Sequence, residues 1–188
     1  MDDVVLCRHG ESETAAVGVV GGDAPLTALG REQAREAGRA LADHPFDICF
    51  TSPALRARET AALVLEGRDV PQAVLPELAD IEFGAFVGTA LPEYRAWIAE
   101  HDPAEAPPGG ESRAATLTRF CRAYRTLLER ADAHLLVVAH GLTLTALTED
   151  PPRPSVTGVP YGSSLELTRT ELAAAVARLE RWCEAPAW

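Results

Sequence analysis

The sequence predicts an α/β fold, a three-layer sandwich in which helices flank a mostly parallel central sheet. Strand-like and helix-like segments alternate along the chain without a low-complexity linker between them. Continuous apolar runs at residues 4–7 and 135–139 are typical of strands buried on both faces of a parallel sheet. A length of 188 residues with 47% hydrophobic content suits a single domain, over residues 1–188, with a substantial core.

The first helices and strands follow from capping residues and apolar spacing. A helix is expected over residues 27–42, because a threonine at its start can cap it and apolar residues recur at helical spacing. Residues 47–51 then supply a second short strand. Ser52 followed by Pro53 is typical of an N-cap and a first helical position, and the helix that they open is expected to run to about Leu65.

A third short strand near residues 73–75 leads into an irregular stretch over residues 76–88. A helix is expected around residues 91–100. The segment over residues 102–110 is rich in proline and glycine, which indicates a loop. Residues 89–112 together are expected to form a lid-like insertion, and whether its loop closes over a ligand stays open.

The last third of the chain contains a long helix and one ambiguous segment. The helix is expected from about residue 113 to residue 130, and it precedes the strand that ends before His140. Residues 163–168 and 173–179 can be read as a final hairpin. The alanine-rich segment over residues 172–182 is almost as good an amphipathic helix, so both readings stay open.

The basic residues exclude two classes of enzyme. All 17 are arginine, and the chain contains neither lysine nor asparagine. A Walker-type phosphate loop and a Schiff-base enzyme both need a lysine, so both classes are excluded. The formal net charge of -11 works against non-specific binding of nucleic acid or an anionic membrane, and neither is expected as a partner. Any bound anion must therefore be held by a local cluster of arginines.

Several features predict a cytoplasmic location without membrane attachment. The first residues lack the basic and apolar regions of a signal peptide, and no apolar run approaches transmembrane length. The cysteines lie far apart and form no C-x-x-C pair, so neither a zinc site nor a disulfide framework is indicated. All of them are expected to be small buried hydrophobic residues: Cys7, Cys49, Cys121 and Cys183.

Two histidines, His9 and His140, follow apolar runs that are expected to be strands. Ligands of parallel sheets collect at the carboxyl ends of the strands, which is where both histidines are expected to lie. Each of them precedes a glycine, which lets the backbone turn sharply and approach a ligand closely. The two histidines are therefore expected to share one pocket.

The residue types near these histidines suit phosphoryl transfer. A neutral imidazole such as that of His9 can attack phosphorus and form a phosphohistidine, which splits hydrolysis into two easier steps. The guanidinium groups of Arg8 and Arg56 match phosphate oxygens and stay charged at any working pH. His140 can add another donor to the transferring oxygens, and one such donor is worth roughly 10²–10³ in rate.

A carboxylic acid is needed to protonate the leaving oxygen. Asp80 and Glu82 lie in the irregular stretch after the third strand, which is a suitable place for such a group. Carboxylates in loops are ordinarily exposed surface, so the choice between the two stays open. The other histidines, His44, His101 and His134, are expected to be ordinary hydrogen-bonded side chains.

With these residues in place, the chain resembles the histidine phosphatase superfamily, whose fold is phosphoglycerate mutase-like. Short motifs carry the resemblance, and they occur in the order of the family over most of the chain. They are R-H-G-E at residues 8–11, P-L-T-x-x-G-x-x-Q-A at 25–34, S-P-x-x-R-A-x-x-T at 52–60, F-G-x-x-x-G within 78–88, G-G-E-S at 109–112 and the final His140-Gly141. Any one of these patterns can arise by chance, but the ordered set at strand ends is specific.

The resemblance implies a role for each residue of the expected pocket. His9 is the residue that becomes phosphorylated. Arg8, Arg56 and His140 form the phosphate pocket. The resemblance implies neither a catalytic metal nor another cofactor.

Two positions depart from the pattern of the family. The proton donor is usually a glutamate four residues before the glycine of the F-G pair, a position that Asp80 occupies here, and Glu82 is the alternative. Many relatives carry an asparagine that contacts the phosphoryl group where this chain has Ala15. Ser12, or a backbone amide near residues 21–22, is expected to compensate for it.

The resemblance implies a metal-independent phosphomonoester hydrolase that acts on a small organic phosphate and is similar to the broad-specificity and α-ribazole-phosphate-type phosphatases. Three alternatives stay open: a phosphoglycerate mutase-type phosphotransferase, a phosphohistidine protein phosphatase and a non-catalytic protein that binds phosphate ligands. A mutase needs additional cations around its site, and this short, acidic and lysine-free chain offers few. The physiological substrate and the oligomeric state are not predicted.

Overall fold

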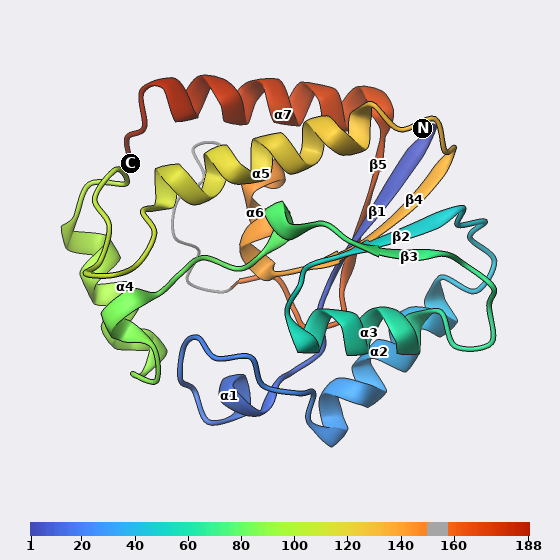
Figure 1. Ribbon diagram of the computed structural model, residues 1–188, viewed down its shortest axis with the longest axis horizontal. Helices are drawn as coiled ribbons and strands as arrows, with labels where there is room; N and C mark the ends of the chain where they lie inside the picture. The colour runs from blue at the N-terminus through green and yellow to red at the C-terminus, as the bar shows by residue number, and fades with distance from the viewer. Residues whose placement is uncertain (150–157) are drawn as a thin grey trace.

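The computed structural model describes residues 1–149 and 158–188, which form one five-stranded sheet with helices around it (Figure 1). The strands are β1 (Asp3–Arg8), β2 (Ile48–Thr51), β3 (Gln72–Val74), β4 (His134–Ala139) and β5 (Ser164–Thr168). Their order across the sheet is β3-β2-β4-β1-β5. All pairings among β1 to β4 are parallel, and β5 is antiparallel to β1. The predicted, mostly parallel sheet is therefore confirmed.

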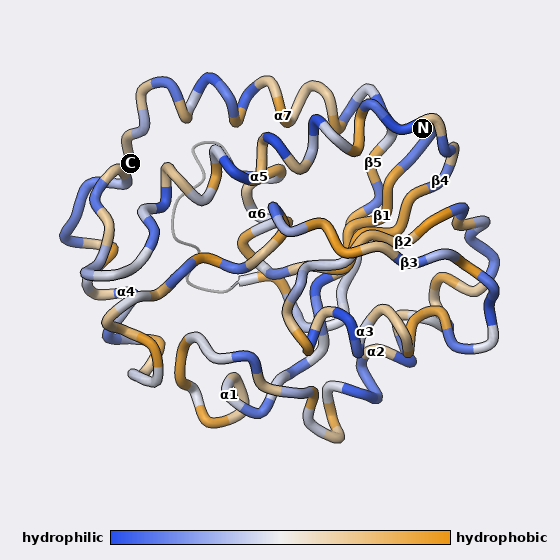
Figure 2. Tube along the Cα trace, viewed as in Figure 1, coloured by the Kyte–Doolittle hydropathy of each residue, from blue (hydrophilic) through white to orange (hydrophobic). Residues whose placement is uncertain are grey.

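Helices cover both faces of this sheet, as Figure 1 shows. One face carries α2 (Ala28–Ala40) and α3 (Leu55–Val64), and the other carries α5 (Arg113–Leu128), α6 (Gly141–Thr148) and α7 (Arg169–Glu184). Alternate residues of β1 show why both faces need a cover, because Val5 packs into the core beneath α2 and α3 while Val4 packs into the core beneath α5 and α7. The central strands β1, β2 and β4 are accordingly mainly hydrophobic in Figure 2, and the predicted three-layer sandwich is confirmed.

A third, smaller core lies beyond the carboxyl ends of the parallel strands. It joins Val20, Ile81 and two residues of α4 (Leu91–Glu100), Tyr94 and Ile98. The short helix α1 (Glu13–Ala16) and the 3-10 turns at Pro76–Leu78 and Gly84–Phe86 complete this region. The helix predicted over residues 91–100 is confirmed, and it stands beside the strand ends where a ligand is expected.

Local capping explains why several helices begin where the sequence predicts. Thr27 accepts a hydrogen bond from the amide of Gly30 at 2.9 Å and caps α2. Ser112 caps α5 in the same way through Ala115, at 3.1 Å. At the start of α7, Thr168 and Glu171 form a reciprocal capping box.

Two expectations about the secondary structure were wrong. Ser52 is not the N-cap of the next helix, because α3 begins only at Leu55 and the residue before it, Ala54, is its N-cap. The Ser52 amide instead donates to Val138 of β4 at 3.0 Å, so sheet pairing outweighs the local capping preference. The final hairpin is absent from the described residues: Ser164–Thr168 forms β5, but Arg169–Glu184 is helical, as the alternative reading predicted.

The cysteine prediction holds for three residues and fails for the fourth. Cys7, Cys49 and Cys121 are buried, but Cys183 is partly exposed near the end of α7. Its side chain shares a hydrogen bond with that of Cys121 on α5. Within residues 1–149 and 158–188, no helix is both long and apolar enough to cross a membrane.

Candidate active site

The parallel register of β1 and β4 brings the two predicted histidines together. Arg8 and Ala139 are register partners at the ends of these strands, so the next residues, His9 and His140, leave the sheet side by side. Their ring centroids lie 5.2 Å apart. Both side chains are buried, at 5% and 1% exposure, and they line one cavity as expected.

Two contacts determine which nitrogen of His9 carries the proton. Nδ1 lies 2.6 Å from the carbonyl oxygen of Gly10, which only accepts hydrogen bonds, so Nδ1 must be the donor. Nε2 lies 3.2 Å from Nε of Arg56, which only donates, so Nε2 must carry the lone pair. The ring therefore presents an unprotonated Nε2 to the pocket, as a nucleophile requires.

Burial keeps both histidines neutral at ordinary pH. It lowers the pKa of His9 well below the ordinary value, and the nearby His140 and Arg56 lower it further. Burial also lowers the pKa of His140 to about 4, although the Asp80 carboxylate opposes that shift. Nε2 of His140 lies 2.7 Å from the Ser52 hydroxyl, which holds the ring in place. The sequence did not single out Ser52 for this role.

Arg56 is the central cation of the site. It lies in the first turn of α3, is only 7% exposed, and donates through Nη1 to the carbonyl of Gly22 at 3.1 Å. Its Nη2 lies 2.8 Å from Oδ2 of Asp80 and 3.3 Å from Nδ1 of His140. One guanidinium thus contacts the candidate nucleophile His9, the second histidine and the candidate acid.

One helical turn further along α3, Thr60 ties this helix to the loop that carries His9. Its hydroxyl donates to the carbonyl of Arg56 at 2.7 Å and accepts from the amide of Gly10 at 3.0 Å. The arginine and the threonine of the S-P-x-x-R-A-x-x-T motif therefore act on the same loop. The threonine is a structural part of the site that the sequence did not identify.

Asp80 contacts Arg56 and His140, whereas Glu82 lines an adjoining cavity that it shares with Arg56 and Asp80. Oδ2 of Asp80 lies 2.8 Å from Nη2 of Arg56 and 3.3 Å from Nδ1 of His140. Burial by itself raises the pKa of the Asp80 carboxyl, but His140 and Arg56 outweigh it and hold that pKa below its usual value. The Glu82 side chain is exposed and does not line the cavity that contains both histidines.

A clamp that sequence reasoning missed holds the Asp80 loop. Arg119 of α5 donates to the carbonyl oxygens of Glu77, Ala79 and Asp80, at 2.9, 2.8 and 3.2 Å. Its Nη2 also pairs with Glu111 at 2.6 Å. The glutamate of the G-G-E-S motif therefore orients an arginine that fixes the backbone around the candidate acid.

Arg8 also lines the cavity of the two histidines. Its guanidinium carbon lies 3.7 Å from the centroid of the Tyr161 ring, and Nη1 donates to the carbonyl of Val159. Its Nε is buried and has no hydrogen-bond partner among the described residues. Tyr161 also lies near His9, with ring centroids 5.7 Å apart, and no sequence pattern had indicated it.

Two motif glycines allow α2 to approach the loop that carries His9. A side chain on Gly10 would place its Cβ 2.2 Å from the carbonyl oxygen of Gly30, and one on Gly30 would place it 2.0 Å from that of Glu11. Both distances are too short for a carbon atom. Nearby, Gln33 accepts a hydrogen bond from the Glu11 amide at 2.9 Å. The R-H-G-E and P-L-T-x-x-G-x-x-Q motifs thus form one contact that supports the His9 loop.

The cavity above the histidines has a volume of about 350 Å³. Leu91, Tyr94 and Ile98 of α4 form an apolar wall, and Arg95 and Arg113 also line the cavity. These two arginines correct the expectation that few further cations face the site. No residue of the 103–110 loop lines it; Pro108 instead accepts a hydrogen bond from the Ala85 amide at 2.9 Å.

Ala15 lines a small adjoining cavity together with His9, Arg56 and Ser12, so the expectation that Ser12 compensates for the asparagine found in relatives stays a prediction. The Ser12 hydroxyl caps α1 by accepting from the Ala15 amide at 3.4 Å. Gly22 presents its carbonyl, rather than its amide, to Arg56. Thr14 lines the same small cavity, and its hydroxyl lies 3.3 Å from that of Ser12, so it is a second candidate.

Among the described residues, the group of three side chains arranged to hold a metal ion lies outside this cavity. It consists of Asp3, His44 and Glu166. Asp3 begins β1, whereas His9 follows the last residue of that strand. The candidate site itself suits phosphate binding, because Arg8 lines the cavity of the two neutral histidines and Arg56 contacts both of them.

Comparisons with known proteins agree with this geometry. A family model for the histidine phosphatase superfamily (branch 1) matches residues 4–182. An adenosylcobalamin/alpha-ribazole phosphatase from Salmonella typhimurium is 38% identical over 157 residues, which cover 76% of this chain and 75% of that protein. A 2,3-bisphosphoglycerate-dependent phosphoglycerate mutase from a Methylobacterium species is also 38% identical, over 165 residues and 77% of each chain.

Solved structures agree as well. The alpha-ribazole phosphatase from Shigella flexneri superposes with a TM-score of 0.74 at 30% identity, over 87% of this chain and 89% of that chain. The predicted fold and the predicted type of enzyme, a histidine phosphatase, are both confirmed. The chain belongs to the histidine phosphatase superfamily, branch 1.

Proposed function

We propose that this protein hydrolyses the phosphomonoester of a small organic alcohol, without a metal ion, through a phosphohistidine at His9. The arrangement of Arg56 carries the proposal, because this residue fixes the lone pair of His9 and also contacts His140 and Asp80. These are the nucleophile, a hydrogen-bond donor to the phosphoryl oxygens and the acid that the two-step reaction needs.

In the first step, Nε2 of His9 attacks phosphorus while Asp80 protonates the leaving oxygen. The bond between phosphorus and the ester oxygen breaks, and the alcohol leaves. In the second step, the Asp80 carboxylate takes a proton from water, which attacks the phosphohistidine. The bond between phosphorus and nitrogen breaks, and inorganic phosphate leaves with His9 restored. Arg8, Arg56 and His140 hold the phosphoryl oxygens in both steps.

Asp80 must be protonated for the first step, although the free enzyme holds it as a carboxylate beside Arg56. The phosphoryl group of the substrate competes for the same guanidinium. When it binds there, Asp80 loses the attraction of its cation and gains a negative neighbour, and both changes raise its pKa. Substrate binding thereby favours the acid form of Asp80.

The side chains that line the cavity favour one class of substrate. Leu91, Tyr94 and Ile98 offer an apolar face beside the phosphate pocket, which fits a phosphate ester that carries an aromatic or other apolar group. The relatives named alpha-ribazole phosphatases fit this class. We therefore propose a ribosyl phosphate that bears an aromatic base. We also propose a cytoplasmic location; the four cysteines are not paired in disulfides.

The test is hydrolysis of p-nitrophenyl phosphate in excess EDTA by the wild type, His9→Ala and a control variant, His101→Ala. His101 lies outside the site and hydrogen-bonds to the carbonyl of Trp97. We expect the wild type and the control to be active in EDTA and His9→Ala to be inactive. Activity that depends on a metal, or that survives in folded His9→Ala, would contradict the proposal.

Mutase activity is the second candidate, because Arg95 and Arg113 also line the cavity and one class of relatives is named phosphoglycerate mutase. A second anionic group on a substrate can pair with such cations. A coupled assay with 3-phosphoglycerate and 2,3-bisphosphoglycerate decides between the two activities. We expect turnover far below the rate of phosphomonoester hydrolysis, and the reverse ratio would favour the mutase.

A further inference from the structure

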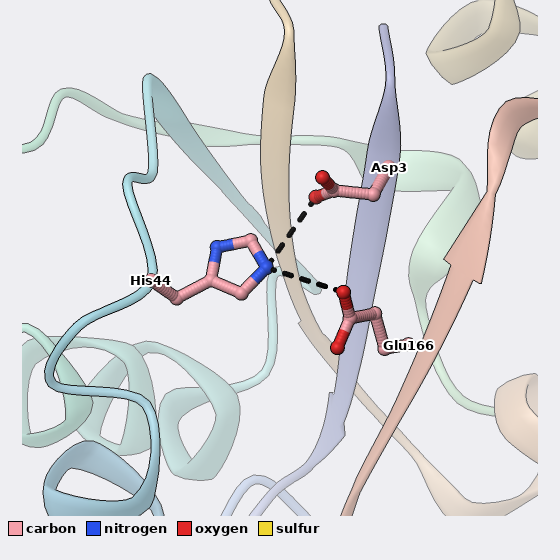
Figure 3. Close-up of side chains that lie close together, drawn as sticks. All are labelled: Asp3, His44 and Glu166. Carbon is pink, nitrogen blue, oxygen red and sulfur yellow. Dashed lines mark ion pairs between the residues drawn. The ribbon is translucent and has the colours of Figure 1, made fainter.

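The side chains of Asp3, His44 and Glu166 meet at the end of the sheet opposite the candidate active site (Figure 3), and His134 contacts Asp3 there. Asp3 begins β1, His134 begins β4, Glu166 lies in β5, and His44 lies in the connection between α2 and β2. The five residue steps of β1 between Asp3 and Arg8 place this cluster about 17 Å from the phosphate pocket. At that distance the cluster cannot take part in the proposed hydrolysis.

Strand register explains why these side chains share one face of the sheet. Asp3 pairs directly with His134 in the parallel ladder, and Glu166 pairs with Val5, two residues along β1 from Asp3. Side chains two residues apart on a strand point to the same side. That side also carries α2, whose following loop brings His44 over the sheet (Figure 3).

The spacing of the donor atoms fits a small tetrahedral ion. Nε2 of His44 lies 3.4 Å from Oδ1 of Asp3 and 3.7 Å from Oε1 of Glu166. An ion with ligand bonds of about 2.1 Å, such as zinc, sets neighbouring ligand atoms about 3.4 Å apart at the corners of a tetrahedron. Both distances from His44 are therefore close to those that such an ion requires, and all three donor atoms lie within 4.8 Å of one another.

The surroundings of the three donors also resemble those of a metal site. Nδ1 of His134 lies 2.6 Å from Oδ2 of Asp3, so it holds that carboxylate by the oxygen that does not face His44. The ring of His44 stacks on Phe46, with centroids 4.4 Å apart. Oδ1 of Asp3 is buried without a hydrogen-bond partner among the described residues, and an ion would satisfy it.

We propose that Asp3, His44 and Glu166 bind a divalent transition-metal ion, and that zinc is the ion that the donor spacing fits best. An imidazole donor beside two carboxylates favours zinc over calcium or magnesium, which prefer oxygen ligands throughout. Three protein ligands leave the fourth position to water. The ion would join the loop after α2 and the edge strand β5 to β1, and it plays no part in hydrolysis.

The test is zinc titration by isothermal calorimetry, together with the visible spectrum of the cobalt-loaded protein. We expect one ion per chain for the wild type and an affinity at least 10-fold weaker for His44→Ala and for Glu166→Gln. We expect His134→Gln to weaken binding by about 10-fold, because it removes the hydrogen bond that orients a ligand. The melting temperature of the wild type should rise with zinc, and that of His44→Ala should not.

Two control variants separate this site from others. Asp43→Asn removes an exposed carboxylate next to His44 in sequence and should bind zinc as the wild type does. His9→Ala should also bind it normally. Zinc binding that is lost in His9→Ala but kept in His44→Ala would place the ion at the catalytic histidines and overturn the proposal, as would the absence of stoichiometric binding. Hydrolysis in EDTA should be unaffected by His44→Ala, so the two proposals fail independently.

Discussion

Replacement of Asp80 by asparagine should slow catalysis and, at the same time, strengthen the binding of inorganic phosphate. In the free enzyme the Asp80 carboxylate lies 2.8 Å from Nη2 of Arg56, where a phosphoryl oxygen must bind. The side chain therefore competes with substrate and product for the same cation. A neutral amide of the same size removes that competition and leaves the shape of the site unchanged.

The magnitude follows from the contact that phosphate must break. A hydrogen bond between charged groups contributes about 1.5–3 kcal/mol. Because about 1.4 kcal/mol corresponds to a tenfold change in an equilibrium constant, Asp80→Asn should tighten product inhibition by phosphate roughly 10- to 100-fold. Loss of the acid should slow the hydrolysis of alkyl phosphates by about 10²–10⁴-fold. The hydrolysis of p-nitrophenyl phosphate should slow much less, since its leaving group needs little protonation.

The assay measures the inhibition constant of phosphate and the rates with both kinds of ester. Glu82→Gln is the matched control, because its side chain is exposed and outside the cavity of the histidines. It should leave all three quantities unchanged. Unchanged or weaker phosphate inhibition in Asp80→Asn would refute the argument that this carboxylate occupies the phosphoryl position. The leaving-group effect in Glu82→Gln instead would identify Glu82 as the acid.

Three further predictions concern stability, positioning and thiol chemistry. Because burial lowers the pKa of His140 from 6.5 to about 4, the unfolded chain binds its proton first as the pH falls, and the free energy of unfolding should decrease between those two values. The decrease in the free energy of unfolding is about 3 kcal/mol. In urea denaturation, the free energy of unfolding of His140→Gln should depend less steeply on pH than that of the wild type. The same pH dependence in both proteins would contradict the lowered pKa of His140. Arg119→Gln should lower kcat by at least tenfold for alkyl phosphates, because it frees the Asp80 loop. The exposed control Arg122→Gln should have no effect. Equal rates in both variants would exclude the role of Arg119 in holding that loop. Cys183 should react first with a disulfide reagent and give a fast kinetic phase, since it is partly exposed and a hydrogen bond lowers its pKa. Cys183→Ser should abolish this phase. A fast phase that persists in Cys183→Ser would assign the reactivity to another cysteine.

Local signals were sufficient to predict most of the fold. A few residues adjacent in sequence determine the apolar runs of β1 and β4 and the helix cap at Thr27. These features could therefore be identified without knowledge of the tertiary structure. The same is true of the pairing of His9 with His140, because parallel strands end at the same edge of a sheet. Ser52 shows the limit, since its hydrogen bonds to distant residues replaced the cap that its neighbours suggest.

The remaining parts of the site depend on contacts between residues far apart in the sequence. Arg119 reaches backbone carbonyls about 40 positions earlier, and an exposed arginine on an amphipathic helix would have the same local pattern. Tyr161 meets Arg8 only because β5 returns antiparallel to β1. The cluster around Asp3 likewise requires the register of three strands. The histidines within it looked ordinary in the sequence for that reason.

Detection of the covalent intermediate tests the central claim most directly. The enzyme is mixed with substrate, quenched within milliseconds in neutral denaturant, because phosphohistidine is labile to acid, and digested for mass spectrometry. A phosphoryl group on His9 that forms before phosphate is released, and that is absent from His9→Ala, is the predicted result. Turnover at the full rate with no phosphorylated His9, or with the phosphoryl group on another residue, would contradict the account.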